Sequence, residues 1–288
     1  MKLTATLLTG LTLLLFSCSK NEVNPVTPVV PPAPIAASTM LNVPYGSDAL
    51  QKMDVYLPSG RSTATTKLMI IVHGGSWSAG DKADMTQFVD SLQKRLPGYA
   101  VANINYRLAS LSGNTFPSQE TDVKSAVDFV NNKRNEYNIS DKFVLLGVSA
   151  GSHLSLLQAY KNSVPKIKAV VDFFGPNDMT DMYNNPASSS APASGIALLL
   201  NGPPPSALYT SSSPINFVTA QSPPTIILHG GADPLVRYQQ SVALRNKLML
   251  NAVAQQYVFY PLEGHGWIGA NLIDSFDKVQ AFLNLYVQ

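Results

Sequence analysis

The sequence contains one cysteine in 288 residues and little charge of either sign. A single cysteine cannot form a disulfide within the chain, and it excludes zinc or iron–sulfur sites built from several cysteines. Twenty Lys and Arg residues against 18 Asp and Glu give a net charge of +2, which provides no basic surface for nucleic acid. The 45% hydrophobic content excludes wholesale disorder. What remains is a neutral globular protein that is long enough to fold without a metal or a cross-link.

The N-terminal segment lacks an apolar run long enough to span a bilayer, since the 14 residues 3–16 fall short of the ~20 required. A basic start at Lys2 and a short apolar core predict an export signal at residues 1–17. The lone Cys18 follows in Leu15-Phe16-Ser17-Cys18, which resembles a bacterial lipobox, although Phe16 is bulkier than the residue usual there. The resemblance implies cleavage before Cys18 and its lipidation. The alternative is an ordinary secretory signal with an incidental cysteine.

Residues 18–40 carry five prolines and almost no charge, without helical or strand periodicity. Such a segment is typical of an extended spacer that holds a domain away from a surface. We therefore expect an exported, membrane-anchored bacterial lipoprotein, facing the periplasm or the cell surface, with its folded domain at residues 41–288. Several acyl chains on Cys18 would anchor it stably, whereas one chain binds only marginally.

The folded part alternates short apolar runs with helical patterns, which predicts a mostly parallel sheet covered by helices. The expected strands are residues 53–57, 68–72, 100–106, 143–146, 169–174, 225–228 and 257–260. Apolar residues at helical spacing predict helices near 123–130, 238–250 and 273–283. The insert at about 176–220 is rich in Ser, Pro and Asn and interrupts this pattern. A loop of this length is usually functional or disordered, so it is either a lid or a tolerated insertion.

Ser149 is the candidate nucleophile, in the pentapeptide Gly147-Val148-Ser149-Ala150-Gly151. An apolar strand precedes the motif and a helical pattern follows it, which is the context that G-x-S-x-G requires. The turn is so tight that the positions two residues away from the serine cannot carry large side chains. We expect the hydroxyl to project above the edge of the sheet, at a helix N-terminus.

A serine hydroxyl needs an oriented base, and only four histidines are present. In this architecture the order along the chain is serine, acid, histidine. His265 is the only histidine that follows both Ser149 and a plausible acid, and it lies in a loop just after a strand. His73 and His153 lie before or almost beside the serine, and His229 falls in or at the end of a strand. We therefore predict His265 as general base.

The acid must lie between the serine and the histidine. The candidates are Asp172, Asp178, Asp181, Asp233 and Glu263. Asp233 comes directly after a strand, and a helix and a strand fit between it and His265, so we predict that Asp233 orients His265. The others fall within a buried strand, in the insert, or on the histidine loop itself. The Asp-Pro pair also suits a simple turn, and the two interpretations are compatible.

An oxyanion requires preorganised donors, and the amide of Ala150 is one because it follows the nucleophile. The loop after the 68–72 strand, beginning His73-Gly74-Gly75, is the expected second source. We predict the amides of Gly75 and Ser76 as donors, with Gly74 as a further candidate. His73 is expected to hold the loop, and Trp77 either lines a pocket or packs in the core.

Together these motifs resemble the α/β-hydrolase superfamily, and more narrowly the esterases related to hormone-sensitive lipase and to small feruloyl or acetyl carbohydrate esterases. The matching pieces include His73-Gly74-Gly75-Ser76-Trp77, Asn105-Tyr106-Arg107 and Gly264-His265-Gly266. Ser76 replaces a third glycine of the lipase pattern, which weakly favours the carbohydrate-esterase side. The resemblance implies an α/β-hydrolase fold and a serine esterase without cofactor or metal, acting on small-molecule or glycan esters. The alternatives are a prolyl-oligopeptidase-type peptidase and a non-catalytic hydrolase-fold binding lipoprotein.

Overall fold

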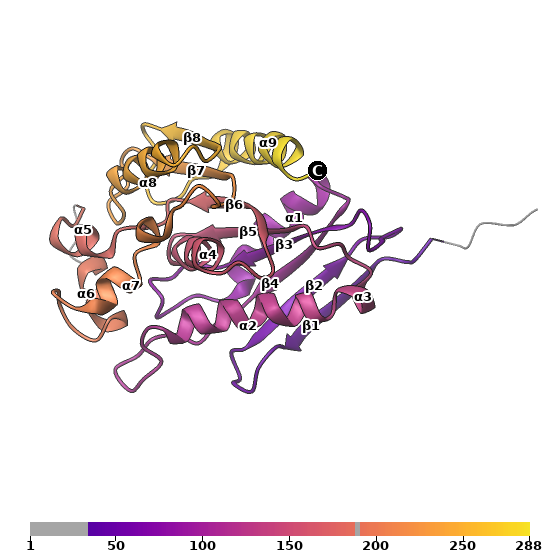
Figure 1. The fold of residues 1–288 in the computed structure, drawn as a ribbon, viewed down its shortest axis with the longest axis horizontal. Coiled ribbons are helices and arrows are strands. Elements are labelled where there is room, and N and C mark those ends of the chain that lie inside the picture. The colour runs from indigo at the N-terminus through magenta and orange to yellow at the C-terminus, as the bar shows by residue number, and fades with distance from the viewer. Residues whose placement is uncertain (1–33, 188–190) are drawn as a thin grey trace, which may run out of the picture. The chain divides into compact units, whose positions relative to one another are not determined.

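The computed structural model describes residues 34–187 and 191–288. These residues build one eight-stranded sheet with the order β1-β2-β4-β3-β5-β6-β7-β8 (Figure 1). Its strands are β1 (Ser38–Pro44), β2 (Lys52–Leu57), β3 (Lys67–Val72), β4 (Tyr99–Ile104), β5 (Phe143–Val148), β6 (Ile167–Phe173), β7 (Thr225–Gly230) and β8 (Gln255–Tyr260). The predicted signal at 1–17, Cys18 and most of the predicted spacer lie outside the described residues.

The sheet is parallel from β4 to β8, and only β2 runs antiparallel to its neighbours β1 and β4. The predicted mostly parallel sheet is therefore confirmed. Strand β1 begins at Ser38, before the predicted domain start at Leu41, so the end of the predicted spacer 18–40 belongs to the sheet. Sequence reasoning missed this edge strand because it contains no fully buried residue that would mark it as part of a core.

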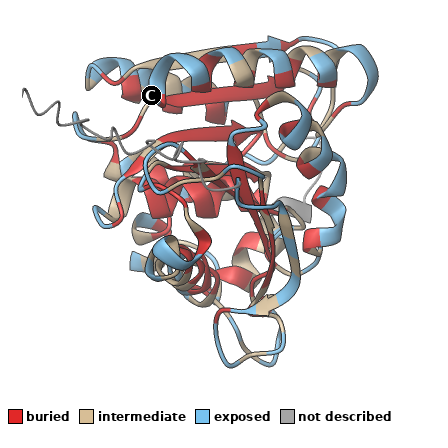
Figure 2. Cartoon of the chain, turned by 90° about the vertical axis from the view of Figure 1, so that its right-hand side faces the viewer, coloured by how far each residue is buried: buried red, intermediate tan, exposed pale blue. Residues whose placement is uncertain are grey.

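Helices cover both faces of the sheet. The helices are α1 (Thr86–Arg95), α2 (Ser118–Asn132), α3 (Arg134–Tyr137), α4 (Ala150–Lys161), α5 (Met179–Asn184), α6 (Ala191–Leu199), α7 (Ala207–Ser211), α8 (Gln239–Leu250) and α9 (Gly269–Tyr286), with short 3-10 turns η1 (Lys82–Met85) and η2 (Pro214–Phe217). Helices α1 and α9 pack on one face, and α2, α4 and α8 pack on the other. Figure 2 shows the buried strands between helices whose outer sides are exposed.

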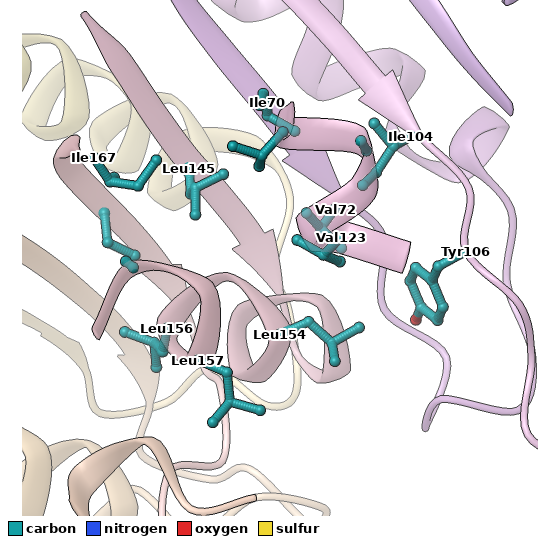
Figure 3. Close-up of a cluster of buried hydrophobic side chains, with 14 of the residues drawn as sticks. Ile70, Val72, Ile104, Tyr106, Val123, Leu145, Leu154, Leu156, Leu157 and Ile167 are labelled. Carbon is teal, nitrogen blue, oxygen red and sulfur yellow. The ribbon is translucent and has the colours of Figure 1, made fainter. Parts of the chain in front are cut away.

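The core on the α4 side explains why the strand sequences are apolar without alternation. Strands β3 and β5 send residues such as Ile70 and Leu145 toward α4, which contributes Leu154 and Leu157 to the same buried cluster (Figure 3). The neighbouring residues on the same strands face α1 and α9, and they include Met69 and Leu146. Because both faces are covered, these strands have no solvent side and hence no polar alternation.

The insert at 176–220 is more regular than the sequence indicated, since it holds α5, α6, α7 and η2. Its residues 188–190 are outside the described part. Ile196 and Leu199 of α6 and Tyr209 of α7 are buried in the same core as α4. The proline- and serine-rich composition concealed these short helices, because they are held by packing rather than by helix propensity.

Asp172 is a buried carboxyl group on β6, with none of its surface exposed. Its Oδ1 accepts a hydrogen bond from the Gly175 amide at 2.8 Å. Among the described residues, Oδ2 has no hydrogen-bond partner. Burial therefore raises the pKa of Asp172 to about 6, because the charged form loses hydration that the protein only partly replaces.

This burial predicts a pH-dependent cost in stability. Between the ordinary carboxyl pKa and about 6, the folded protein retains a proton that the unfolded chain releases, so stability falls as pH rises through that window. We expect the free energy of unfolding of Asp172→Asn, measured in urea at pH 8, to exceed that of the wild type by about 2–3 kcal/mol. This difference should vanish toward pH 4. The exposed Asp141→Asn is the control and should show no such trend. A difference independent of pH would contradict the assignment.

Candidate active site

Ser149 lies at the turn between β5 and α4 with φ 55° and ψ −120°, a backbone conformation that is rare for residues other than glycine. The two glycines of the motif permit the turn. A Cβ on Gly147 would come within 2.3 Å of the Gly151 backbone, and one on Gly151 would come within 2.1 Å of the Val72 carbonyl oxygen. No side chain fits at either position, which is the physical reason for the G-x-S-x-G spacing.

The structure brings the three predicted catalytic side chains together. His265 Nε2 lies 2.8 Å from Ser149 Oγ, and His265 Nδ1 lies 2.7 Å from Asp233 Oδ2. With the proton on Nδ1, the ring donates to the carboxylate and leaves Nε2 free to accept the serine proton. The alignment suits removal of a proton from Ser149 as its oxygen attacks an electrophile.

Asp233 and His265 meet because two loops approach at backbone distance. A Cβ on Gly230 would lie 2.2 Å from the Gly264 carbonyl oxygen, so glycine is required there. The Ala232 amide donates to the Glu263 carbonyl at 2.9 Å, which ties the acid loop after β7 to the histidine loop after β8. The close approach fixes the separation of the two side chains.

Asp233 is a buried carboxylate whose two oxygens both have partners. Oδ1 accepts the amides of Leu235 and Val236 at 2.8 and 2.9 Å, and Oδ2 faces His265. Burial alone would raise the pKa of Asp233, but hydrogen bonds from His229, His265 and Val236 outweigh it and hold the pKa well below its usual range. Asp233 is therefore ionised and can stabilise a positive charge on His265.

Sequence reasoning set His229 aside as a strand residue, yet its Nε2 lies 3.3 Å from Asp233 Oδ2. The sequence did carry a signal for this contact, because His229 lies only four residues before Asp233, at the end of β7. Phe174 was also missed. Its ring centre lies 4.7 Å from that of His265, and its φ of 44° is unusual for a bulky residue.

The predicted oxyanion loop lies over the nucleophile. A Cβ on Gly74 would come within 3.3 Å of Ser149 Cβ, and Gly75 and Ser76 both have positive φ. Within residues 34–187 and 191–288, the amides of Gly75 and Ser76 donate to no other group. Ala150 occupies the first position of α4, where an amide has no partner in the helix. Gly75, Ser76 and Ala150 thus line the spaces beside Ser149, and within the described part of the chain their amides are available to an oxyanion.

The side chains of His73 and Trp77 hold this loop in place through contacts with neighbouring residues. His73 Nδ1 lies 2.6 Å from the Gly74 carbonyl oxygen, and its ring stacks on Tyr106 at 4.3 Å. Trp77 is buried and donates its Nε1–H to His153 Nδ1 at 3.1 Å. Complete burial lowers the pKa of His153 to about 4, so its ring stays neutral and accepts that bond.

A cavity of about 350 Å³ opens beside Ser149 and His265. Its walls are mostly apolar and include Phe88, Phe173, Phe174, Leu235, Trp267 and Leu272. A much smaller space, about 20 Å³, lies on the Trp77 side of Ser149, and Pro176 and Met182 of the insert line it. Residues of the insert therefore border the site.

Among the described residues, no group of three or more His, Cys, Asp or Glu side chains is arranged to hold a metal ion. The family model BD-FAE matches residues 53–248, which cover Ser149, Asp233 and the oxyanion loop. The chain belongs to the BD-FAE family. The matched stretch ends before His265, so the position of this histidine in the site comes from the tertiary structure.

Relatives of this BD-FAE chain include mycobacterial proteins. It is 30% identical to the probable carboxylic ester hydrolase LipM and 27% identical to esterase LipC, both of Mycobacterium tuberculosis. The matches cover 69% and 83% of this chain but 48% and 63% of those relatives. The chain thus spans about half to three fifths of the length of the curated relatives that it matches.

Several solved structures of esterases have a fold similar to that of this chain. A truncated carbohydrate esterase from gut microbiota is 29% identical with a TM-score of 0.74, over 87% of this chain and 96% of that one. A bifunctional GH43-CE protein of Bacteroides eggerthii is 26% identical with a TM-score of 0.76, over 87% and 35%. Esterase B of Lactobacillus rhamnosis shares the fold at 21% identity and a TM-score of 0.68, over 88% of each chain. The predicted α/β-hydrolase fold and the resemblance to this group of esterases are confirmed.

The crowding at Gly151 makes a testable prediction about the nucleophile turn. Gly151→Ala places a methyl group 2.1 Å from the Val72 carbonyl oxygen, so the turn must open. We expect the free energy of unfolding, measured in urea, to fall by about 3 kcal/mol or more. Gly98→Ala is the matched control, because its Cβ would meet nothing within 4 Å, and it should change stability by less than about 0.5 kcal/mol. Equal stability of the two variants would contradict the packing argument.

Proposed function

We propose that this protein is a serine hydrolase that cleaves carboxylic esters through an acyl-enzyme intermediate. The observation that carries the proposal is the unbroken series of contacts from Ser149 through His265 to Asp233. The unused amides of the oxyanion loop lie beside the same serine, and the relatives named above are described as esterases. A protein that only bound a ligand would not need a serine, a histidine and an aspartate in contact with one another beside free amide donors.

The reaction follows from the geometry. Ser149 Oγ attacks the ester carbonyl carbon while His265 Nε2 takes its proton, and Asp233 stabilises the resulting imidazolium. The amides of Gly75, Ser76 and Ala150 donate to the negative oxygen of the tetrahedral intermediate. His265 then gives its proton to the leaving alcohol. A water molecule then attacks the acyl carbon while His265 takes its proton, and His265 returns that proton to Ser149 Oγ as the bond between this oxygen and the acyl carbon breaks and the acid is released.

The substrate class we propose is esters with a small acyl group, including acylated carbohydrates. The cavity of about 350 Å³ accepts an apolar group of limited size, and its aromatic walls also suit an aromatic acyl group. Two of the similar structures are described as a carbohydrate esterase and a GH43-CE protein. Acetylated or feruloylated sugars are therefore the first glycan substrates to examine.

A peptidase is the second candidate function. The chain is 24% identical over 72% of its length to dipeptidyl aminopeptidase BIII of Pseudoxanthomonas mexicana, but it covers 31% of that protein. The nucleophile, base and acid would serve either reaction. Esters are favoured because most of the relatives and similar structures named above are described as esterases.

The first prediction from this mechanism concerns the side chains of Ser149 and Asp233. Ser149→Ala should abolish p-nitrophenyl acetate hydrolysis and fluorophosphonate labelling without loss of folding, because it removes the oxygen that lies 2.8 Å from His265 Nε2. Asp233→Asn should lower kcat by about 10⁴, since the ring of His265 then loses the partner that fixes its tautomer. Thermal unfolding controls for stability. Full activity in Ser149→Ala would refute the mechanism.

A panel of substrates tests the class with the same wild-type protein. It should contain p-nitrophenyl esters of increasing acyl length, acetylated xylan, a feruloylated sugar and dipeptide p-nitroanilides. We expect hydrolysis of short-chain esters and of at least one acylated carbohydrate. Faster turnover of the anilides would favour the peptidase, and labelling of Ser149 without turnover of any member would favour a binding protein.

We also propose that the mature protein is a lipoprotein anchored to a bacterial membrane through Cys18. The support is the sequence alone, in the lipobox-like Leu15-Phe16-Ser17-Cys18 and the proline-rich segment after it. No helix within the described ranges combines the length and the apolar character of a bilayer span. A lipid on Cys18 would supply an anchor in a different way.

The anchor is tested by expressing the full chain in a bacterium that processes lipoproteins. We expect the wild type to incorporate an alkyne fatty acid and to sediment with membranes. Cys18→Ser should lose both properties, while Ser17→Ala should keep them as the matched control. A Cys18→Ser variant that still sediments and carries the label would refute lipidation at this position.

A further inference from the structure

His229 is a fully buried histidine behind the catalytic acid. It lies near the end of β7, against helix α8. Its Nδ1 is 2.6 Å from Ser241 Oγ of α8, and its Nε2 is 2.9 Å from the Val236 carbonyl oxygen on the loop after Asp233. The ring therefore connects α8 to the loop that carries the acid, and both of its nitrogens have partners.

These partners determine where the proton of the ring lies. The Val236 carbonyl can only accept a hydrogen bond, and Asp233 Oδ2, 3.3 Å from the same Nε2, is ionised and can also only accept. The proton must therefore be on Nε2. Ser241 can donate its hydroxyl proton, so Nδ1 is free to accept from it. Every group of this cluster is satisfied with one tautomer and one ring orientation.

The position of His229 matters because Asp233 Oδ2 is the oxygen that also faces His265 Nδ1, at 2.7 Å. Oδ1 is held by the Leu235 and Val236 amides. Val236 thus holds the carboxylate with its amide, while its carbonyl is itself held by His229. Without the ring, the carbonyl of Val236 and one side of Oδ2 would face an empty buried space, so the carboxylate and the loop whose amides hold Oδ1 would both lose a partner that fixes their position.

We propose that His229 is a positioning residue for the reaction, which acts through Asp233 by holding its carboxylate in line with His265. It does not line the cavity of about 350 Å³ beside Ser149 and takes no proton from the substrate. The inference rests on the proposed esterase mechanism, because it assigns a purpose to the alignment of Asp233. It differs from a merely structural role in that the alignment, and not only the stability, depends on the ring.

Two substitutions separate these roles in the full-length protein. Gln reaches far enough to place an N–H where His229 Nε2 lies, whereas Asn is shorter and leaves that place empty. We expect His229→Asn to lower kcat for p-nitrophenyl acetate by about 10–100-fold with KM changed less than about threefold, because the acid is misaligned but the cavity is intact. His229→Gln should recover most of the lost kcat.

A proton NMR measurement reports on the alignment without any turnover. The hydrogen bond between His265 Nδ1–H and Asp233 should give a low-field resonance in the wild type, which is lost or shifted in His229→Asn and restored in His229→Gln. His153→Asn is the matched control, since it removes an equally buried histidine whose ring bonds to Trp77 and Ser212 instead. Its low-field resonance should stay unchanged.

Ser241→Ala provides a second variant that leaves the ring in place. We expect ¹⁵N-histidine spectra still to show the Nε2–H tautomer, because Val236 and Asp233 fix it, but kcat to fall by about 3–10-fold, because the ring has lost the hydrogen bond that holds it against α8. The proposal is overturned if folded His229→Asn retains both the resonance and a kcat within twofold of the wild type. If His229→Asn does not fold, an unchanged low-field resonance together with an unchanged kcat in Ser241→Ala overturns it. If the wild type hydrolyses no ester, the proposed function fails, and the resonance still decides whether His229 aligns Asp233.

Discussion

The site depends on the close contact between the backbone of β3 and the first turn of α4, at Gly151. This contact leaves no room for a side chain, and it sets Ser149 in a strained backbone conformation above the end of β5. It also brings the loop after β3 beside the serine, so the nucleophile and its oxyanion donors share one constraint. The cost of the strained turn is met by the packing of α4 against the sheet.

A second close backbone approach, between Gly230 and Gly264, fixes the loops that carry the acid and the base, just as the first fixes the turn that carries the serine. The loops after β7 and β8 touch through their backbones, so the separation of Asp233 and His265 does not depend on flexible side chains. Rigid neighbouring strands carry both loops. Preorganisation of this kind is what allows hydrogen-bonded groups to act in catalysis without first being rearranged.

The buried polar groups around the site form two kinds of environment. Asp233 is surrounded by N–H groups and is ionised, whereas Asp172, on the neighbouring strand β6, has one oxygen without a partner among the described residues and a raised pKa. His153 and His229 are both buried, but His153 supports Trp77 while His229 contacts the acid. Burial alone therefore does not indicate the role of a titratable residue, and the identity of its partners does.

The sequence by itself determined the parallel sheet, since strands buried on both faces are continuously apolar, and it singled out Ser149, Asp233 and His265 from order and spacing. Short motifs suffice there because each depends on local backbone geometry. Only the tertiary structure placed β1, the helices of the insert, Phe174 and His229, because these are held by contacts between residues far apart in the chain. The same reason hid the cavity, whose walls come from separate elements, α1 and α9 among them, that no local pattern relates to one another.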